Sequence, residues 1–144
     1  ENDPEYFGPQ YVADVEGNFV TEDMRLLQAP VTVNLEEAAG YVREIGGMVI
    51  PAHIDRAHGL MTVLGLWPSD FIADAAEVSH NIHPRQAHDL YHLPDELTLI
   101  SNSDAHWIAW IGKVCTVYEL NGPPSVAMLK KALHNMDDCR AYVP

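Results

Sequence analysis

The residues of this sequence best suited to chemistry are an aspartate and a histidine two positions apart, Asp104 and His106, which follow an apolar run. Side chains at positions i and i+2 of an extended strand point the same way, so this carboxylate and imidazole can face one point. Such a donor pair suits Zn²⁺, Mn²⁺ or iron. The alternative is that Asp104 caps a helix beginning near Trp107 and that His106 only follows it.

His53 is the candidate for a third ligand, because it follows a second short apolar run, Met48-Val49-Ile50. In folds that alternate helices with parallel strands, ligands and metals gather where the strands end. We therefore predict a divalent metal site, for zinc, manganese or iron, with His53, Asp104 and His106 as its ligands.

Three more polar residues follow the same predicted strands. Arg56 is suited to holding a phosphoryl group through its guanidinium fork, unless it forms a salt bridge with Asp55 or another acid. Glu77 lies inside a strand predicted to be buried, where it either orients a ligand histidine or pairs with an arginine. His80 follows that strand and is a candidate for contact with substrate or metal. We predict Arg56 and His80 as substrate-binding residues and Glu77 as a residue supporting the metal ligands.

A competing motif places His88 and His92 four residues apart, with an acid, Asp89, after the first histidine. This resembles the zinc-peptidase pattern His-Glu-x-x-His, with Asp in place of Glu. Asp is one methylene shorter, and the predicted helix between Pro84 and Pro94 has only about two turns. The sequence favours exposed surface histidines here.

The elements that would position these residues alternate between helices and short apolar strands. A helix is predicted over residues 35–45, with Asn34 as its N-cap and Gly46-Gly47 at its end. Further helices are expected over 60–67, 69–73, 84–92 and 124–134, and buried strands over 48–50, 75–79, 97–101, 114–118 and 139–143. A small hairpin is expected over residues 11–20, around Gly17-Asn18.

This alternation predicts an α/β fold with a mostly parallel sheet and covering helices. We expect residues 1–144 to form a single segment. In it, residues 1–30 are a hairpin-containing lead-in and residues 31–144 are βα units.

The composition excludes several classes of function. The chain has 8 Lys and Arg against 21 Asp and Glu, a net charge of −13. No basic stripe suits the phosphate backbone of double-stranded DNA, and no apolar run reaches the ~18 residues that a membrane helix needs. Two cysteines, Cys115 and Cys139, are too few for a disulfide scaffold, which favours the cytoplasm.

The stretches Gly47–Arg56 and Ile100–His106 resemble the PHP (polymerase and histidinol phosphatase) superfamily, above all its stand-alone phosphoesterase-like members. Residues 2–8 and Arg25-Leu26-Leu27 are also similar to that subgroup. The resemblance covers residues 1 to about 120, and Ser103-Asp104-Ala105-His106 is its most specific part.

The resemblance implies a distorted (β/α)7 barrel whose strand ends hold two or three zinc, manganese or iron ions. It implies hydrolysis of a small phosphorylated substrate, a nucleotide or another phosphate ester, by metal-activated water. By matching position, His53 is the ligand of the middle motif and Asp104 and His106 are the final ligand pair. Glu77 matches a strand residue of the family.

The sequence departs from the family at its start, where the family has a His-x-His strand and this chain has no histidine before His53. We therefore expect the C-terminal part of a PHP protein, with an incomplete metal centre and little activity of its own. Open sheet edges would favour a homo-oligomer. The alternative is a non-catalytic PHP-like module that binds a partner.

Overall fold

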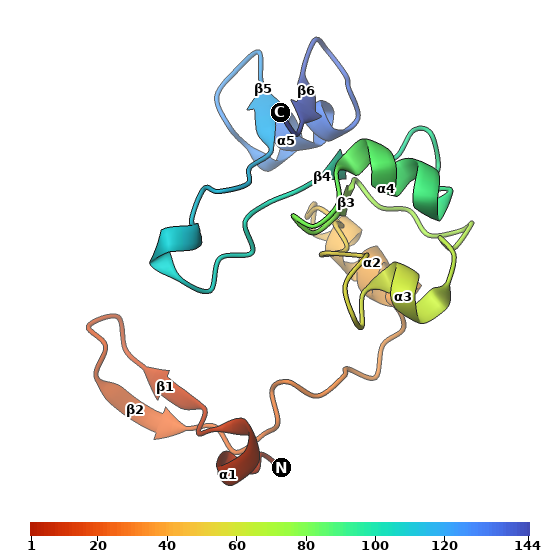
Figure 1. The fold of residues 1–144 in the computed structure, drawn as a ribbon. Coiled ribbons are helices and arrows are strands. Elements are labelled where there is room, and N and C mark those ends of the chain that lie inside the picture. Colours follow the sequence, from red (N-terminus) through yellow and green to blue (C-terminus); the bar gives the residue numbers. More distant parts are fainter. The chain divides into compact units, whose positions relative to one another are not determined.

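The computed structural model describes residues 1–144, which divide into two compact units, Glu1–Asn34 and Leu35–Pro144 (Figure 1). The larger unit contains every residue predicted to take part in the chemistry.

The smaller unit consists of a short helix, α1 (Pro4–Phe7), and the antiparallel strands β1 (Tyr11–Ala13) and β2 (Phe19–Glu22). The predicted hairpin is confirmed. Its turn is organised by the Asp14 carboxylate, which accepts hydrogen bonds from the backbone N–H groups of Glu16 and Asn18 at 3.0 and 2.8 Å. Gly17 occupies the turn with φ +87°, a backbone conformation that glycine adopts without strain.

The larger unit contains four α-helices, a 3₁₀ helix and four short strands. Along the chain they are α2 (Leu35–Glu44), α3 (Leu60–Leu64), β3 (Ala76–Glu77), α4 (Pro84–Tyr91), β4 (Leu99–Ile100), η1 (Ile108–Trp110), β5 (Val117–Glu119), α5 (Val126–Leu133) and β6 (Arg140–Tyr142). The helices predicted over 35–45, 84–92 and 124–134 are confirmed as α2, α4 and α5. The residues of the predicted helix over 69–73 form no helix.

The predicted mostly parallel sheet with covering helices is wrong. The chain forms three separate two-stranded sheets, of which only β3–β4 is parallel, whereas β1–β2 and β5–β6 are antiparallel. The structure is therefore not a part of a (β/α)7 barrel in which every strand runs parallel to its neighbours.

One reason lies in the predicted strand over 48–50. This segment runs beside β3, since Asp74 N donates to Val49 O at 2.8 Å and Glu77 N donates to Pro51 O at 2.9 Å. Pro51 has no N–H to return, so the ladder is interrupted and no regular strand forms.

A second reason lies beyond β4, where side chains replace the main-chain ladder. The Thr116 hydroxyl accepts from Ser101 N and donates to Ser101 O, at 3.1 and 3.0 Å. Ser103 Oγ likewise donates to Val114 O and accepts from Val114 N. The chain that leads into β5 is thus held beside β4 by hydroxyl groups, and β5 itself pairs with β6.

The buried side chains of the larger unit form two clusters. The first lies among α3, β3, α4 and β4 and is centred on the fully buried Ile54 and Val78. The second joins β4 to α5 and β6 and includes Leu133 and Ile100. No helix of the chain combines the length and the apolar character required to cross a bilayer.

Candidate functional site

Three chain segments of the larger unit end side by side. Ile54 N donates to Glu77 O at 2.8 Å, and Val78 N donates to Ile100 O at 2.9 Å. Because these segments run parallel, their carboxyl ends lie along one edge. We call the residues at this edge, 53–56, 77–80 and 101–106, the strand-end rim. The six predicted site residues lie within these ranges, and the structure brings Arg56 and His106 against Asp104 and Glu77 against the backbone of His53.

Asp104 contacts two side chains of the strand-end rim that can carry positive charge. Its Oδ2 lies 2.5 Å from Arg56 Nη1, and its Oδ1 lies 3.5 Å from His106 Nε2. Side chains 48 residues apart in the sequence are thereby brought together. Asp104 and Arg56 are each about one-third exposed, whereas His106 is largely exposed. Asp104 and His106 lie in contact, but not on the extended strand that the sequence predicted, since β4 ends at Ile100 and Asp104 has a φ of 45°. Arg56 pairs with Asp104 and not with Asp55.

His53 occupies a tight bend. Its backbone φ is 30°, and that of Asp104 is 45°, so two of the three predicted ligands adopt left-handed conformations that non-glycine residues rarely adopt. Such conformations concentrate at functional sites. His53 Nδ1 is buried and has no hydrogen-bond partner. A buried imidazole nitrogen without a partner is the kind of group that a bound ion or ligand would satisfy.

Glu77 joins the three segments through its carboxylate. Its Oε1 accepts from Asn102 Nδ2 at 3.1 Å, and its Oε2 accepts from the backbone N of His53 at 3.4 Å. Glu77 thus contacts the main chain of His53, which orients the bend that carries the imidazole. Burial and the negative charge of Glu77 raise the pKa of the Tyr118 hydroxyl.

Asp55 has a structural contact that the sequence did not indicate. Its Oδ1 accepts from Ser79 N at 2.7 Å and its Oδ2 accepts from Ser79 Oγ at 2.5 Å. The bend continues to Gly59, where a Cβ would come within 2.6 Å of the carbonyl oxygens of His53 and Ile54. Only glycine fits here, so this close approach fixes the path of residues 53–59.

His80 lines a cavity of about 250 Å³ together with Ser103, Trp110, Lys113 and Val114. The His80 ring meets the Trp110 ring edge-on at 5.7 Å, and Lys113 Nζ lies 5.3 Å from the Trp110 centroid. Ser103 directly precedes Asp104, so this cavity adjoins the strand-end rim. Lys113 lies in the loop after η1, and this loop brings it to the cavity. No residue spacing in the sequence identified Lys113 as a residue of the site.

The donor set for a metal is incomplete. No group of three or more His, Cys, Asp or Glu side chains in the chain is arranged to hold an ion. The types of donor fit a divalent ion, since Asp104 and His106 lie in contact and His53 carries an unpartnered nitrogen, but they do not fit a complete centre of two or three metals.

The competing pair on α4 forms no such group either. His88 Nε2 lies 3.0 Å from Pro94 O, and His92 ends the helix in a left-handed conformation with φ 49°. The His88 imidazole is therefore engaged by the backbone.

Comparison with known proteins gives no relative: no family model, no curated protein and no solved structure matches this chain.

Proposed function

We propose that the strand-end rim is part of the divalent-metal site of a phosphoesterase. The observation that carries the proposal is the meeting of Asp104, His106 and Arg56 where three parallel segments end. A carboxylate, an imidazole and a guanidinium at one edge combine groups that bind a divalent ion with a group that binds a phosphoryl oxygen.

Asp104 and His106, which lie in contact, would supply two ligands to the ion, and His53 would become the third only by moving toward them, since no three donors of the chain are arranged to hold an ion. When bound, a divalent ion supplies Lewis acidity that polarises a phosphoryl oxygen and activates water. Glu77 holds the bend of His53 through the backbone, and Asp55 fixes the same bend to β3 through Ser79.

Arg56 has two roles in this proposal. Without an ion it neutralises Asp104, and with a substrate present its fork suits two oxygens of a phosphate ester. His80 and Lys113 extend the site along the adjoining cavity, where they offer hydrogen-bond donors and positive charge in a chain of net charge −13. These groups favour a small phosphorylated substrate, either a nucleotide or another phosphate ester.

Three donors are too few for a centre of two or three ions. We propose that further ligands come from outside residues 1–144, so the chain by itself binds an ion weakly and catalyses little.

The experiment measures metal binding and hydrolysis by the same preparation. Calorimetry with Mn²⁺ and Zn²⁺ should detect a site that Asp104→Asn removes, whereas Asp89→Asn, the matched change on α4, leaves it intact. Hydrolysis of p-nitrophenyl phosphate should stay far below the roughly 1–10³ s⁻¹ of ordinary enzymes. Binding unaffected by Asp104→Asn would contradict the metal site, and turnover at ordinary enzyme rates would contradict the incomplete centre.

A second candidate is a non-catalytic module that binds an anionic partner without metal. The observation that favours it is the ion pair of Arg56 with Asp104, which occupies the carboxylate that a metal would need. Asp104→Asn distinguishes the two candidates. If the first is right, the substitution abolishes metal uptake. If the second is right, the substitution leaves binding of the anionic partner unchanged or makes it stronger.

A further inference from the structure

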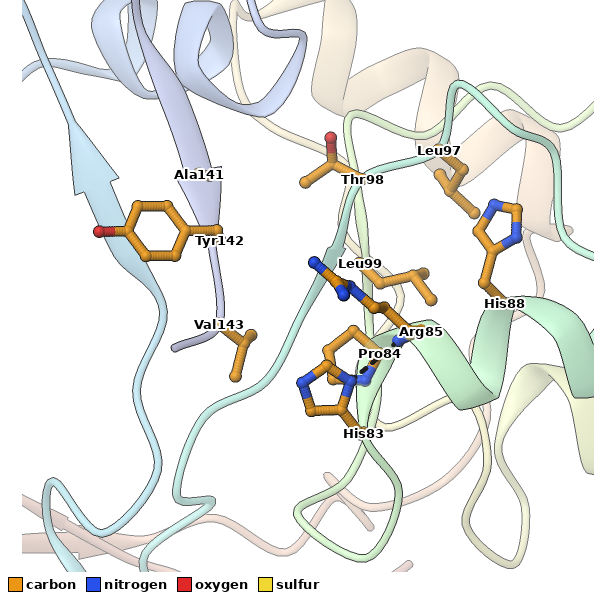
Figure 2. A pocket seen from close by; sticks show the side chains of 10 residues that line it. All are labelled: His83, Pro84, Arg85, His88, Leu97, Thr98, Leu99, Ala141, Tyr142 and Val143. Carbon is orange, nitrogen blue, oxygen red and sulfur yellow. Dashed lines mark hydrogen bonds between the residues drawn. The ribbon is translucent and has the colours of Figure 1, made fainter.

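A cavity of about 420 Å³ lies between α4 and the strands β4 and β6 (Figure 2). This volume is in the range of small-molecule sites. Leu97, Leu99 and Val143 contribute apolar surface. His83, the N-cap of α4, contributes an imidazole, and Arg85 of α4 contributes a guanidinium. No lining residue is acidic, although the chain carries 21 Asp and Glu.

The guanidinium of Arg85 has no partner in the folded chain. The chain has eight Lys and Arg residues. The side chains of the other seven each contact a carboxylate, a carbonyl oxygen or an aromatic ring. Figure 2 shows the Arg85 side chain extending from α4 into the space between β4 and β6. Its N–H donors are therefore free and directed at the cavity.

The position of Arg85 at the start of α4 also favours an anion next to its guanidinium. It lies in the first turn of the helix, directly after Pro84, and no acidic residue shares that turn. A positive charge at this end of a helix is opposed by the helix dipole. An anion bound beside Arg85 would be favoured by both the guanidinium and the dipole.

His83 supplies a second donor. Its Nδ1 accepts the backbone N–H of Arg85 at 3.2 Å, which caps α4. The proton of the neutral ring is therefore on Nε2, which is free to donate. Figure 2 shows this nitrogen turned toward the side of the cavity where Val143 lies. His88, in contrast, already contacts Pro94 O through Nε2.

We propose that this cavity binds a small organic anion, a carboxylate or phosphate monoester carried on an apolar body. The Arg85 guanidinium and His83 Nε2–H donate to the anionic oxygens. The apolar body packs against Leu97, Leu99 and Val143. This site requires no metal and is independent of the strand-end rim.

The experiment titrates the metal-free chain, in EDTA, with benzoate and with phenyl phosphate while amide NMR signals are recorded. Saturable shifts are expected at the start of α4 and in β4 and β6. Benzyl alcohol, which has the apolar body without the charge, should produce no saturable shift. Binding of only one of the two anions supports the site and identifies the anionic group.

Variants then test the donors. Arg85→Gln should weaken binding about tenfold or more, since a charge-assisted bidentate contact is lost. His83→Asn, which keeps a capping oxygen but loses Nε2–H, should weaken it several-fold. Lys131→Gln removes the same charge from a lysine already paired with Asp137 and should leave binding unchanged.

The proposal is overturned if neither anion binds, if the shifts centre on the strand-end rim, or if Arg85→Gln binds as tightly as the unmodified chain. Arg85 is exposed on its helix, so the variant is expected to fold, and an unchanged thermal midpoint checks this.

Discussion

Arg56 and Arg85 are arginines of the same unit with opposite surroundings. Arg56 lies against a carboxylate that the fold brings to it across 48 positions of sequence, whereas Arg85 lines a cavity without a single acid. In the strand-end rim, the charge of Arg56 is matched by Asp104, so an anionic ligand must compete with that carboxylate for it. In the cavity beside α4, the positive charge is available. The comparison shows that the same residue type marks different chemistry according to which carboxylates the fold places nearby.

The two regions also differ in how firmly they are built. The strand-end rim is tied by Glu77 and Asp55, each of which accepts hydrogen bonds from a neighbouring segment. The cavity lies between elements of the two core clusters, and the hydrogen bond drawn among its lining residues in Figure 2 joins His83 to the backbone of Arg85, both at the start of α4. The rim is thus preorganised, and the cavity has room for a ligand.

The largest change in the free energy of unfolding is expected when a buried side chain next to the strand-end rim is truncated. Ile54 is fully buried, and Ile54→Ala should lower the free energy of unfolding by about 2–5 kcal/mol because it leaves a cavity. Urea unfolding measures the change. Leu90→Ala, at an exposed position of α4, should change it by less than about 0.5 kcal/mol. Equal effects of the two substitutions would show that the rim has no such core.

A smaller loss of stability is expected at the bend itself. Gly59→Ala brings a methyl group against two backbone carbonyl oxygens and should cost about 1–3 kcal/mol. Gly40→Ala is the matched control, since a Cβ at this position meets nothing within 4 Å. Because Gly40 lies inside α2, the substitution should stabilise the folded state by about 0.5–1 kcal/mol. Thermal unfolding of both variants tests the pair. A neutral Gly59→Ala would mean that the bend is not fixed.

The comparison of the two arginines is tested most sharply through metal affinity. Arg56→Gln frees Asp104 and should raise the affinity for Mn²⁺ several-fold. The change in the free energy of unfolding should stay at about 1 kcal/mol or below, because water reaches this partly exposed ion pair. Arg85→Gln makes the same change of charge and should leave the metal affinity as it is. An equal increase in both variants would show that only net charge matters.

The smallest effect on stability is expected from an ion pair of a third arginine, Arg25, which lies next to the hairpin of the smaller unit. Hydrogen bonds from its side chain and its backbone lower the pKa of Asp23 from 3.8 to about 2. The ion pair therefore stabilises the folded state above pH 3.8, and this contribution is lost as the pH falls toward 2. The chemical shift of Asp23, followed by NMR, should titrate near 2, and Arg25→Gln should bring it back toward 3.8. A midpoint near 3.8 in the unmodified chain would contradict the contact.

Local sequence signals predicted the local elements well. Asn34 and Gly46 mark the limits of α2, and Gly17 marks the hairpin turn, because caps and turns depend on neighbouring residues. The neighbouring buried segments were also predictable, since the apolar runs at 48–50, 75–79 and 97–101 are each followed by polar residues.

The sheet was not predictable in the same way. Pro51 interrupts the ladder beside β3, and Thr116 replaces main-chain pairing beyond β4, although both lie in or next to runs typical of strands. The partner of Arg56 was equally hidden, because Asp55 is adjacent in sequence and Asp104 is not. Arg85 was missed because no pattern of spacing reveals an arginine without a partner.

The most direct test of the metal site is paramagnetic broadening of amide NMR signals by substoichiometric Mn²⁺. We expect the signals of residues 53–56 and 103–107 to broaden first and Asp104→Asn to abolish this selective loss. Broadening spread over the acidic surface, or centred on residues 88–92, and unchanged by Asp104→Asn would contradict a metal site at the strand-end rim.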